Sequence, residues 1–124
     1  MLRYRCNAGT TQKAIAKISN VKKIGQVYRI IGKRYVVHLK EGYSSTREVV
    51  YLYGEKGTAR FLGFLWGYHG EGPRGLIRLL KYLGLNNTLT ESVPFHFKRG
   101  QNVGIDWEIN ISKNGEVNFY SRNN

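Results

Sequence analysis

The alternating pattern in the C-terminal third of the chain limits the possible fold more than any other feature. Four apolar residues occupy every second position of one run: Ile105, Trp107, Ile109 and Ile111. Such a period of two is typical of a strand with one buried face and one face in water. Asn114-Gly115 follows, a dipeptide that favours a tight hairpin turn, and residues 117–120 have the pattern of a return strand. This third of the chain is therefore predicted to form a β-hairpin.

Further strands are predicted from β-branched and aromatic runs in the rest of the chain. These runs are residues 1–6, 26–31, 34–40, 46–53, 61–66 and 94–98. Gly32-Lys33 is expected to form a two-residue turn between 26–31 and 34–40, and Gly54-Glu55-Lys56-Gly57 the turn after 46–53. The period of the apolar run 61–66 does not separate a buried strand from a helix, and the strand is preferred. Pro94 cannot donate to a neighbouring strand, which makes 94–98 an edge strand.

Two helices are predicted. The first helix covers about residues 73–83 and has a wide leucine-rich face, and Gly84 is placed to end it. A shorter N-terminal helix over about 11–19 begins at Thr10 or Thr11 and places Lys13 and Lys17 on one face. Together these elements predict an α+β fold with an antiparallel sheet of five to seven strands built from hairpins. The length of 124 residues suits a single domain, 1–124.

The charge of the chain is concentrated near its N-terminus. The formal net charge is +12, and the first forty residues hold ten Lys and Arg but no Asp or Glu. A content of 41% hydrophobic residues argues against a disordered basic tail, so phosphate-rich partners of a folded domain are the natural inference. The alternative is a surface made basic for solubility. The residues predicted to contact nucleic acid or phosphate are Arg3, Arg5, Lys13, Lys17, Lys22, Lys23, Arg29, Lys33 and Arg34.

Aromatic residues stand beside several cations in the sequence. The candidates for stacking on bases are Tyr28, Tyr35, Phe95 and Phe97. Rings and cations together are the combination that proteins use to hold single strands or nucleotides. On alternating strands half of such rings face the core, so packing is the competing interpretation for each of them.

The segment from Gly70 to Gly75 has the spacing G-x-G-x-x-G and opens a predicted helix. A helix start can hold a phosphate through its backbone N–H groups. Pro73 removes one of those donors and Glu71 adds a negative charge, which disfavours a dinucleotide-binding domain. A looser anion site that uses Arg74 and Arg78 is the functional hypothesis. In the structural alternative the glycines merely turn the chain.

The same region carries a family resemblance. Phe64-Leu65-Trp66-Gly67-Tyr68-His69-Gly70-Glu71-Gly72-Pro73, followed by a leucine-rich helix, resembles small uncharacterised domains of bacterial and phage genomes with an aromatic-Trp-Gly-Tyr-Gly-x-Gly-Pro segment. The resemblance covers about residues 64–85 and implies a phage or mobile-element origin. It also implies a candidate ligand loop composed of Trp66, Tyr68, His69, Gly70, Gly72, Arg74 and Arg78.

The sequence offers little support for catalysis or metal binding. Cys6 is expected to be a buried small hydrophobe, and the three His residues are widely separated. Asp106 and Glu108 could share one face of a strand as a carboxylate pair, but their alternation with apolar residues places them on a solvent face. No metal or cofactor is predicted, and the chain is expected not to be an enzyme.

The leading hypothesis is a small basic binding protein for phosphate-bearing ligands, above all nucleic acid with little sequence specificity. The alternative is a phage anti-defence protein that captures a nucleotide second messenger or blocks a host defence complex, for example one of CRISPR type. A ribosome-associated structural protein ranks lower. A cytoplasmic location without membrane contact is expected, and the sequence leaves a homo-oligomer open.

Overall fold

The computed structural model describes residues 2–38, 40–96 and 104–121, with the side chains of residues 40, 95 and 96 left out. One sheet has the strand order β1-β4-β3-β2-β5-β6. Its strands are β1 (Leu2–Cys6), β2 (Val27–His38), β3 (Ser44–Gly54), β4 (Gly57–Phe61), β5 (Gly104–Ile111) and β6 (Val117–Ser121). The helical elements are α1 (Thr11–Ile15), η1 (Ile18–Ile24), η2 (Lys40–Gly42), α2 (Glu71–Tyr82) and α3 (Asn87–His96).

These elements confirm the α+β class. The sheet is mostly antiparallel, but β1 runs parallel to β4, so it is a mixed sheet rather than a set of hairpins alone. The parallel pair arises because the chain leaves β1, crosses the sheet through α1 and η1, and returns to β1 only after the β2–β3–β4 meander. The predicted β3–β4 turn and the β5–β6 hairpin are both present.

Residues 27–38 form one continuous strand, so the turn predicted at Gly32-Lys33 is wrong. Gly32 lies in the middle of β2, opposite Trp107 of β5. A Cβ atom at residue 32 would lie 2.2 Å from the indole ring of Trp107. The glycine is therefore required for close packing of the ring on the strand and not for a turn. The chain reverses instead around Glu41 and Gly42, whose φ angles are 69° and 80°.

The two predicted helices are present with altered bounds. Thr10 caps α1 by accepting a hydrogen bond from the backbone N of Lys13 at 3.2 Å. The predicted helix 11–19 then divides, because α1 ends at Ile15 and the 3₁₀ helix η1 follows. Helix α2 begins at Glu71 and ends before Gly84, whose φ is 85°. Helix α2 buries Leu76, Leu79 and Leu80 as the pattern predicted, whereas Ile15 at the end of α1 is only partly buried.

Two of the predicted strands are wrong. The sheet part of 61–66 ends at Phe61, and the following loop brings Phe64 and Trp66 into the core. Pro94 belongs to α3 rather than to an edge strand, and its carbonyl accepts a hydrogen bond from the backbone N of Gly67 at 2.8 Å. Contacts between α3, α2 and this loop outweigh the local preference of the sequence. Residues 97 and 98 of that predicted strand lie outside the described residues.

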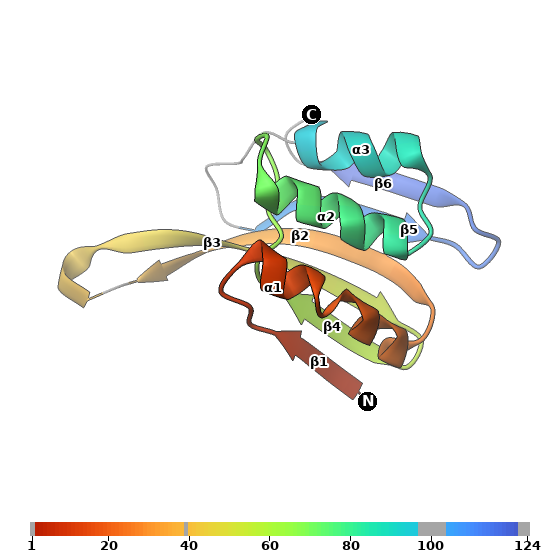
Figure 1. Cartoon of the computed structure of the whole chain (residues 1–124), viewed down its shortest axis with the longest axis horizontal. Coiled ribbons are helices and arrows are strands. Elements are labelled where there is room, and N and C mark those ends of the chain that lie inside the picture. Colours follow the sequence, from red (N-terminus) through yellow and green to blue (C-terminus); the bar gives the residue numbers. More distant parts are fainter. Residues whose placement is uncertain (1, 39, 97–103, 122–124) are drawn as a thin grey trace.

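The described helices cover one face of the sheet, as Figure 1 shows for α1, α2 and α3. The core lies between them, where Leu76, Leu79 and Leu80 of α2 are 0% exposed. Trp66 meets Trp107 edge to face at a centroid distance of 5.6 Å, and its Nε1 donates to Asp106 at 3.0 Å. None of the helices described is long and apolar enough to cross a membrane.

The far half of the β2–β3 pair extends beyond the rest of the sheet. Tyr35–His38 pair with Ser44–Arg47, whereas the pairing to β5 ends at Arg34 and the pairing to β4 ends at Val50. Figure 1 shows this segment as a two-stranded projection, which we call the arm (residues 35–38 and 40–47).

Candidate functional site

The sheet face that points away from the helices carries two rows of side chains that run across the strands. Alternation along each strand sets this face, since Cys6, Phe61 and Leu52 point into the core and their neighbours point away. The first row is Arg5, Arg60, Tyr51, Ile31, Glu108 and Tyr120. The second row is Arg3, Thr58, Tyr53, Arg29, Asn110 and Asn118. We call this surface the open face.

A groove of about 350 Å³ lies over β1, β4 and β3 on the open face. It is lined by Arg3, Tyr4, Arg5, Tyr51, Tyr53, Thr58, Ala59 and Arg60. Three of these described residues are arginines and none is acidic. Arg5 and Arg60 are in direct cross-strand register, and like charges so placed destabilise a sheet. A bound anion would remove that cost.

Arg60 is held at the end of this groove by a side chain from the loop after β1. Its Nη2 donates to Asn7 Oδ1 at 2.7 Å. Its Nε is buried and has no hydrogen-bond partner among the residues that the structure describes. One contact thus positions the guanidinium, and its Nη atoms rather than the buried Nε are the donors left for a ligand.

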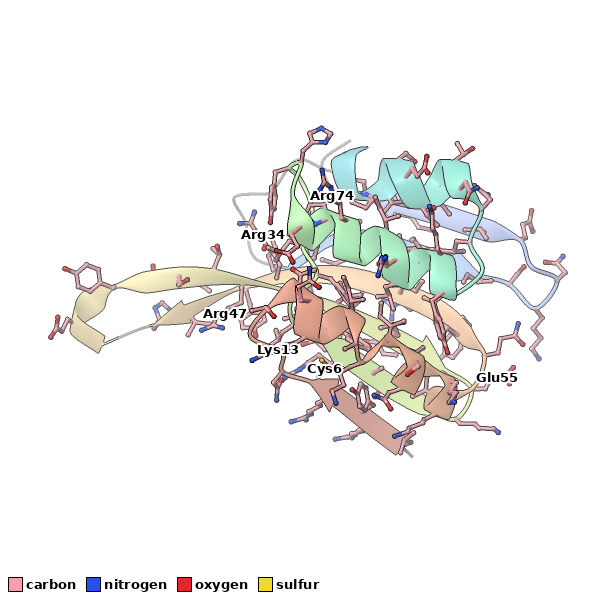
Figure 2. All side chains as sticks on the ribbon, in the orientation of Figure 1. Cys6, Lys13, Arg34, Arg47, Glu55 and Arg74 are labelled. Carbon is pink, nitrogen blue, oxygen red and sulfur yellow. The ribbon has the colours of Figure 1, made fainter. Side chains whose placement is uncertain are left out.

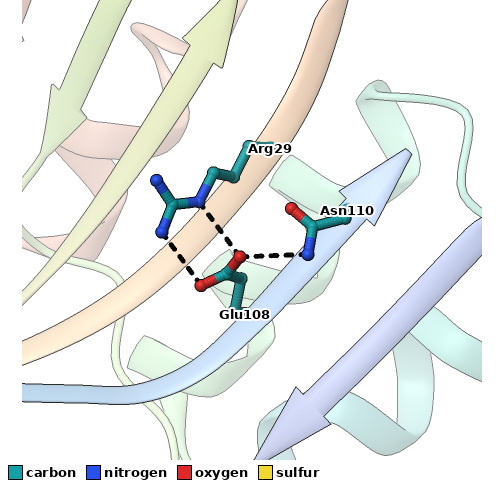
Figure 3. A network of polar contacts seen from close by, with 3 residues as sticks. All are labelled: Arg29, Glu108 and Asn110. Carbon is teal, nitrogen blue, oxygen red and sulfur yellow. Dashed lines mark hydrogen bonds and ion pairs between the residues drawn. The ribbon is translucent and has the colours of Figure 1, made fainter. Parts of the chain in front are cut away.

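Glu108 is the acidic residue of the two rows and lies next to the groove, and its neighbours neutralise its negative charge. Arg29 Nε and Nη2 donate to the two carboxylate oxygens of Glu108 at 3.0 Å each, and Asn110 donates to the same carboxylate at 3.0 Å (Figure 3). These contacts, above all the hydrogen bond from Arg29, lower the pKa of Glu108 and raise the pKa of Arg29. The Arg29 guanidinium also lies 5.2 Å from the ring centroid of Tyr53. Glu108 therefore repels an anion in the groove only weakly.

The nine cations predicted to bind phosphate do not form one surface. Arg3, Arg5, Arg29 and Lys33 lie on the open face. On the helix side, α1 carries Lys13, η1 carries Lys22 and Lys23, and the two-residue link between these helices carries Lys17. The prediction of a single surface is therefore wrong, because the polypeptide passes from the sheet into the helical layer within the first forty residues.

Arg34 is not an accessible cation, which corrects its predicted role. It is 8% exposed, and its Nε lies 3.7 Å from Oε1 of the buried Glu48. The two residues are cross-strand partners of β2 and β3 on the helix side. Register with an acidic partner thus places this arginine inside the protein.

The predicted stacking residues are dispersed. Tyr28 is 49% exposed and lies where the register of β2 and β3 shifts, and Tyr35 is at the base of the arm. The side chain of Phe95 and the whole of Phe97 lie outside the described residues.

Tyr51 and Tyr53, which line the groove, are not among the residues predicted from the sequence. Their i, i+2 spacing does predict a shared face, but the sequence does not tell which face lacks helices.

The glycine loop does not gather its predicted ligand residues into one site. Trp66 is 0% exposed and bonded to Asp106, so its indole is not accessible to a ligand. Gly70 packs against the ring of Tyr68, and Gly72 packs against Leu65, which gives both glycines a packing role. Tyr68 and His69 are exposed. Arg74 and Arg78 line a different groove of about 570 Å³ with Gln12, Ile15 and Glu71.

The possible carboxylate pair is separated by the fold. Asp106 is 0% exposed and bonded to Trp66, whereas Glu108 lies on the open face. A register shift between β2 and β5 at Gly32/Lys33 turns Asp106 inward, so its predicted solvent-facing position is wrong.

Cys6 is buried as expected. In the described part of the chain, no three His, Cys, Asp or Glu side chains come together as a metal site.

The protein is a mixed sheet with helices on one face. The other face carries a groove lined by arginines and tyrosines. Comparisons with protein-family models, with curated proteins and with solved structures each returned no match.

Proposed function

We propose that this protein binds single-stranded nucleic acid across the open face, with little sequence specificity. One observation carries the proposal: Arg3, Arg5 and Arg60 share a groove with Tyr51, and no described residue that lines this groove is acidic. The arginines supply charge for phosphates, and the tyrosine supplies a ring on which a base can stack. The proposal concerns binding and includes no reaction.

The placement of these groups favours a single strand over a duplex. The cations lie on the adjacent strands β1 and β4, and the tyrosines lie on β3 beside them. A backbone that follows the arginines therefore directs its bases toward the tyrosines. In a duplex the faces of the bases are covered by their stacked neighbours, so such rings would have little to contact. Stacking tolerates every base, which is why little specificity is expected.

The decisive experiment compares two double substitutions that remove the same charge from opposite sides. Fluorescence anisotropy with a labelled strand of about 12 nucleotides is measured across a salt series for wild type, Arg3→Ala/Arg5→Ala and Lys22→Ala/Lys81→Ala, whose lysines lie on η1 and α2. Loss of two phosphate contacts lowers the slope of log K against log salt by about 1.4 for a single strand. We expect that decrease for the arginine variant and an unchanged slope for the lysine variant. Equal decreases in both variants would show diffuse attraction and would refute the site.

Substitution of Tyr51 tests whether a base stacks in the groove. Tyr51→Leu is expected to weaken binding roughly 5- to 150-fold, which corresponds to the ~1–3 kcal/mol of one stacked base. Tyr82→Leu is the matched control, because Tyr82 is 48% exposed on α2 and on the helix side. If both tyrosine variants bind like wild type, the groove holds phosphate alone and no base stacks there.

A second candidate, capture of a free nucleotide, is favoured by the groove between α1 and α2. Its volume of about 570 Å³ lies within the range of small-ligand sites, and Arg74 and Arg78 line it. Glu71 lines it as well and opposes a phosphate, which places this candidate second. Calorimetry with mono-, di- and cyclic nucleotides on wild type and Arg74→Ala/Arg78→Ala separates the two functions. Saturable heat that disappears in this variant would support nucleotide capture.

A further inference from the structure

A third groove lies at the edge of the sheet, next to the groove of the open face. It has a volume of about 470 Å³ and runs between β1 and the helical layer. Its lining residues are Tyr4, Arg5, Cys6, Asn7, Ala8, Lys13, Ala16 and Lys17. Figure 2 shows Lys13 and Cys6 close to the junction of α1 and the end of β1. We call this the edge groove.

The edge groove and the open-face groove are continuous at Arg5, which lines both. Strand β1 is the last strand of the sheet on this side, so no described strand separates the two grooves. Lys13 and Lys17 are both exposed, and none of the described residues that line the edge groove is acidic. A positively charged path therefore leads from the sheet over its edge to the N-terminal helices.

The walls of the edge groove also suit a nucleotide. Ala8 and Ala16 are small, and the buried Cys6 adds an apolar surface between the two lysines and Arg5. An apolar floor with cations at its rim can accept a base or sugar while the phosphates remain at the rim. Continuity with the first groove and the shared positive charge identify the occupant as more of the same strand.

We infer that a single strand bound on the open face continues over β1 into the edge groove, where Lys13 and Lys17 contact its phosphates. This inference rests on the proposed function. It extends the binding site from one face of the sheet to a path around its edge. It also gives a role to Lys13 and Lys17, which do not lie on the open face. An acidic peptide in the edge groove is the competing occupant.

Strand length separates this inference from the proposed function. Strands of about 4 and about 12 nucleotides are titrated into wild type, Lys13→Ala/Lys17→Ala and the control Lys22→Ala/Lys81→Ala. We expect the Lys13/Lys17 variant to bind the short strand like wild type and to bind the long strand more weakly, with the salt slope lowered by about 1.4. The Lys22/Lys81 control is expected to match wild type at both lengths, because neither lysine lines either groove.

A charge insertion gives a second measurement that removes no lysine. Ala16 is exposed and lines the edge groove, whereas the exposed Ser19 does not line it. Ala16→Glu is expected to weaken binding of the long strand and to leave the short strand unaffected. Ser19→Glu adds the same charge nearby and is expected to have the smaller effect, and melting temperatures confirm that both variants fold.

Each outcome has a defined meaning. If the Lys13/Lys17 and Ala16 variants match their controls at both lengths while Arg3→Ala/Arg5→Ala binds weakly, the strand stops at the sheet face and the inference is overturned alone. If the arginine variant binds like wild type, the proposed function fails as well. If polyglutamate binds with dependence on Lys13 and Lys17 and no strand does, the edge groove takes an acidic peptide instead.

Discussion

At the scale of single residues, Gly32 shows how one missing side chain determines local structure. The sequence pair Gly32-Lys33 has the composition of a hairpin turn, yet Gly32 lies inside a twelve-residue strand. The ring of Trp107 occupies the space that a Cβ would need. A glycine thus has two uses, a turn or a close approach, and the residues next to it do not distinguish them.

Substitution of Gly32 tests this packing. Gly32→Ala is expected to lower the free energy of unfolding by about 1–3 kcal/mol, because the added methyl group overlaps the Trp107 ring and the core must shift. Gly9→Ala is the control, since a Cβ at Gly9 meets nothing within 4 Å. Urea unfolding followed by circular dichroism measures both. Equal stability of the two variants would contradict the close contact between β2 and Trp107.

The Arg29–Glu108 pair predicts a dependence of stability on acid pH. The folded pKa of Glu108 lies below its ordinary value of 4.5, because Arg29 and Asn110 stabilise the carboxylate. The pair therefore contributes fully above about pH 4.5, and its contribution is lost as the pH falls through the folded pKa. The two side chains are 36% and 22% exposed, so the contribution is less than about 1 kcal/mol.

Glu108→Gln isolates this contribution. The difference in melting temperature between wild type and Glu108→Gln is expected to be largest at neutral pH and to shrink between about pH 5 and about pH 3. Glu91→Gln is the control, because Glu91 has its 3.6 Å contact with Lys81 at 63% exposure. A difference that stays constant over this range would show that the carboxylate of Glu108 is not stabilised in the folded state.

At the scale of elements, short-range signals identify some segments and fail for others. The alternation before Asn114-Gly115 and the leucine face of α2 both correspond to real elements, because each segment buries one side against the same core. The described parts of the segments 61–66 and 94–98 do not form the predicted strands. Phe64 and Trp66 pack into the core, and the carbonyl of Pro94 in α3 accepts a hydrogen bond from Gly67, so partners that are distant in sequence decide both segments.

The arm is an element that the core does not need. Its described side chains from Val36 to Thr46 are exposed, except for the half-buried Val37. Replacing residues 36–46 by Asn-Gly joins Tyr35 to Arg47, which are cross-strand partners, through a favoured hairpin turn. The free energy of unfolding is expected to change by less than about 1 kcal/mol, because none of the described side chains of the arm belongs to the core.

A core substitution in the same strand calibrates that measurement. Leu52 of β3 is 0% exposed, and Leu52→Ala is expected to cost about 2–5 kcal/mol. Both variants are compared by urea unfolding. If shortening the arm destabilises the protein as much as Leu52→Ala does, the arm supports the fold and is not an appendage.

At the scale of the whole molecule, the layering of helices on one sheet face divides the positive charge. Arg3 lines the groove on the open face, and Lys13 and Lys17 line the edge groove. Arg5 lines both grooves. Tyr51, Tyr53 and Arg60 enter the site from strands that the charge pattern does not mark. Net charge alone therefore does not predict binding, and variants with equal charge are expected to differ by the face they alter.

By itself, the sequence determined the α+β class, the amphipathic helix near residues 73–83, the C-terminal hairpin and the excess of cations before Glu41. These properties follow from the spacing of apolar residues and from the positions of charged residues along the chain, and both are local features of the sequence. The tertiary structure alone decided that β1 pairs in parallel with β4, that Trp66 and Arg34 are buried, and that the open face combines arginines with Tyr51. Such pairings are decided by which surfaces exclude water together, and that depends on residues far apart in the chain.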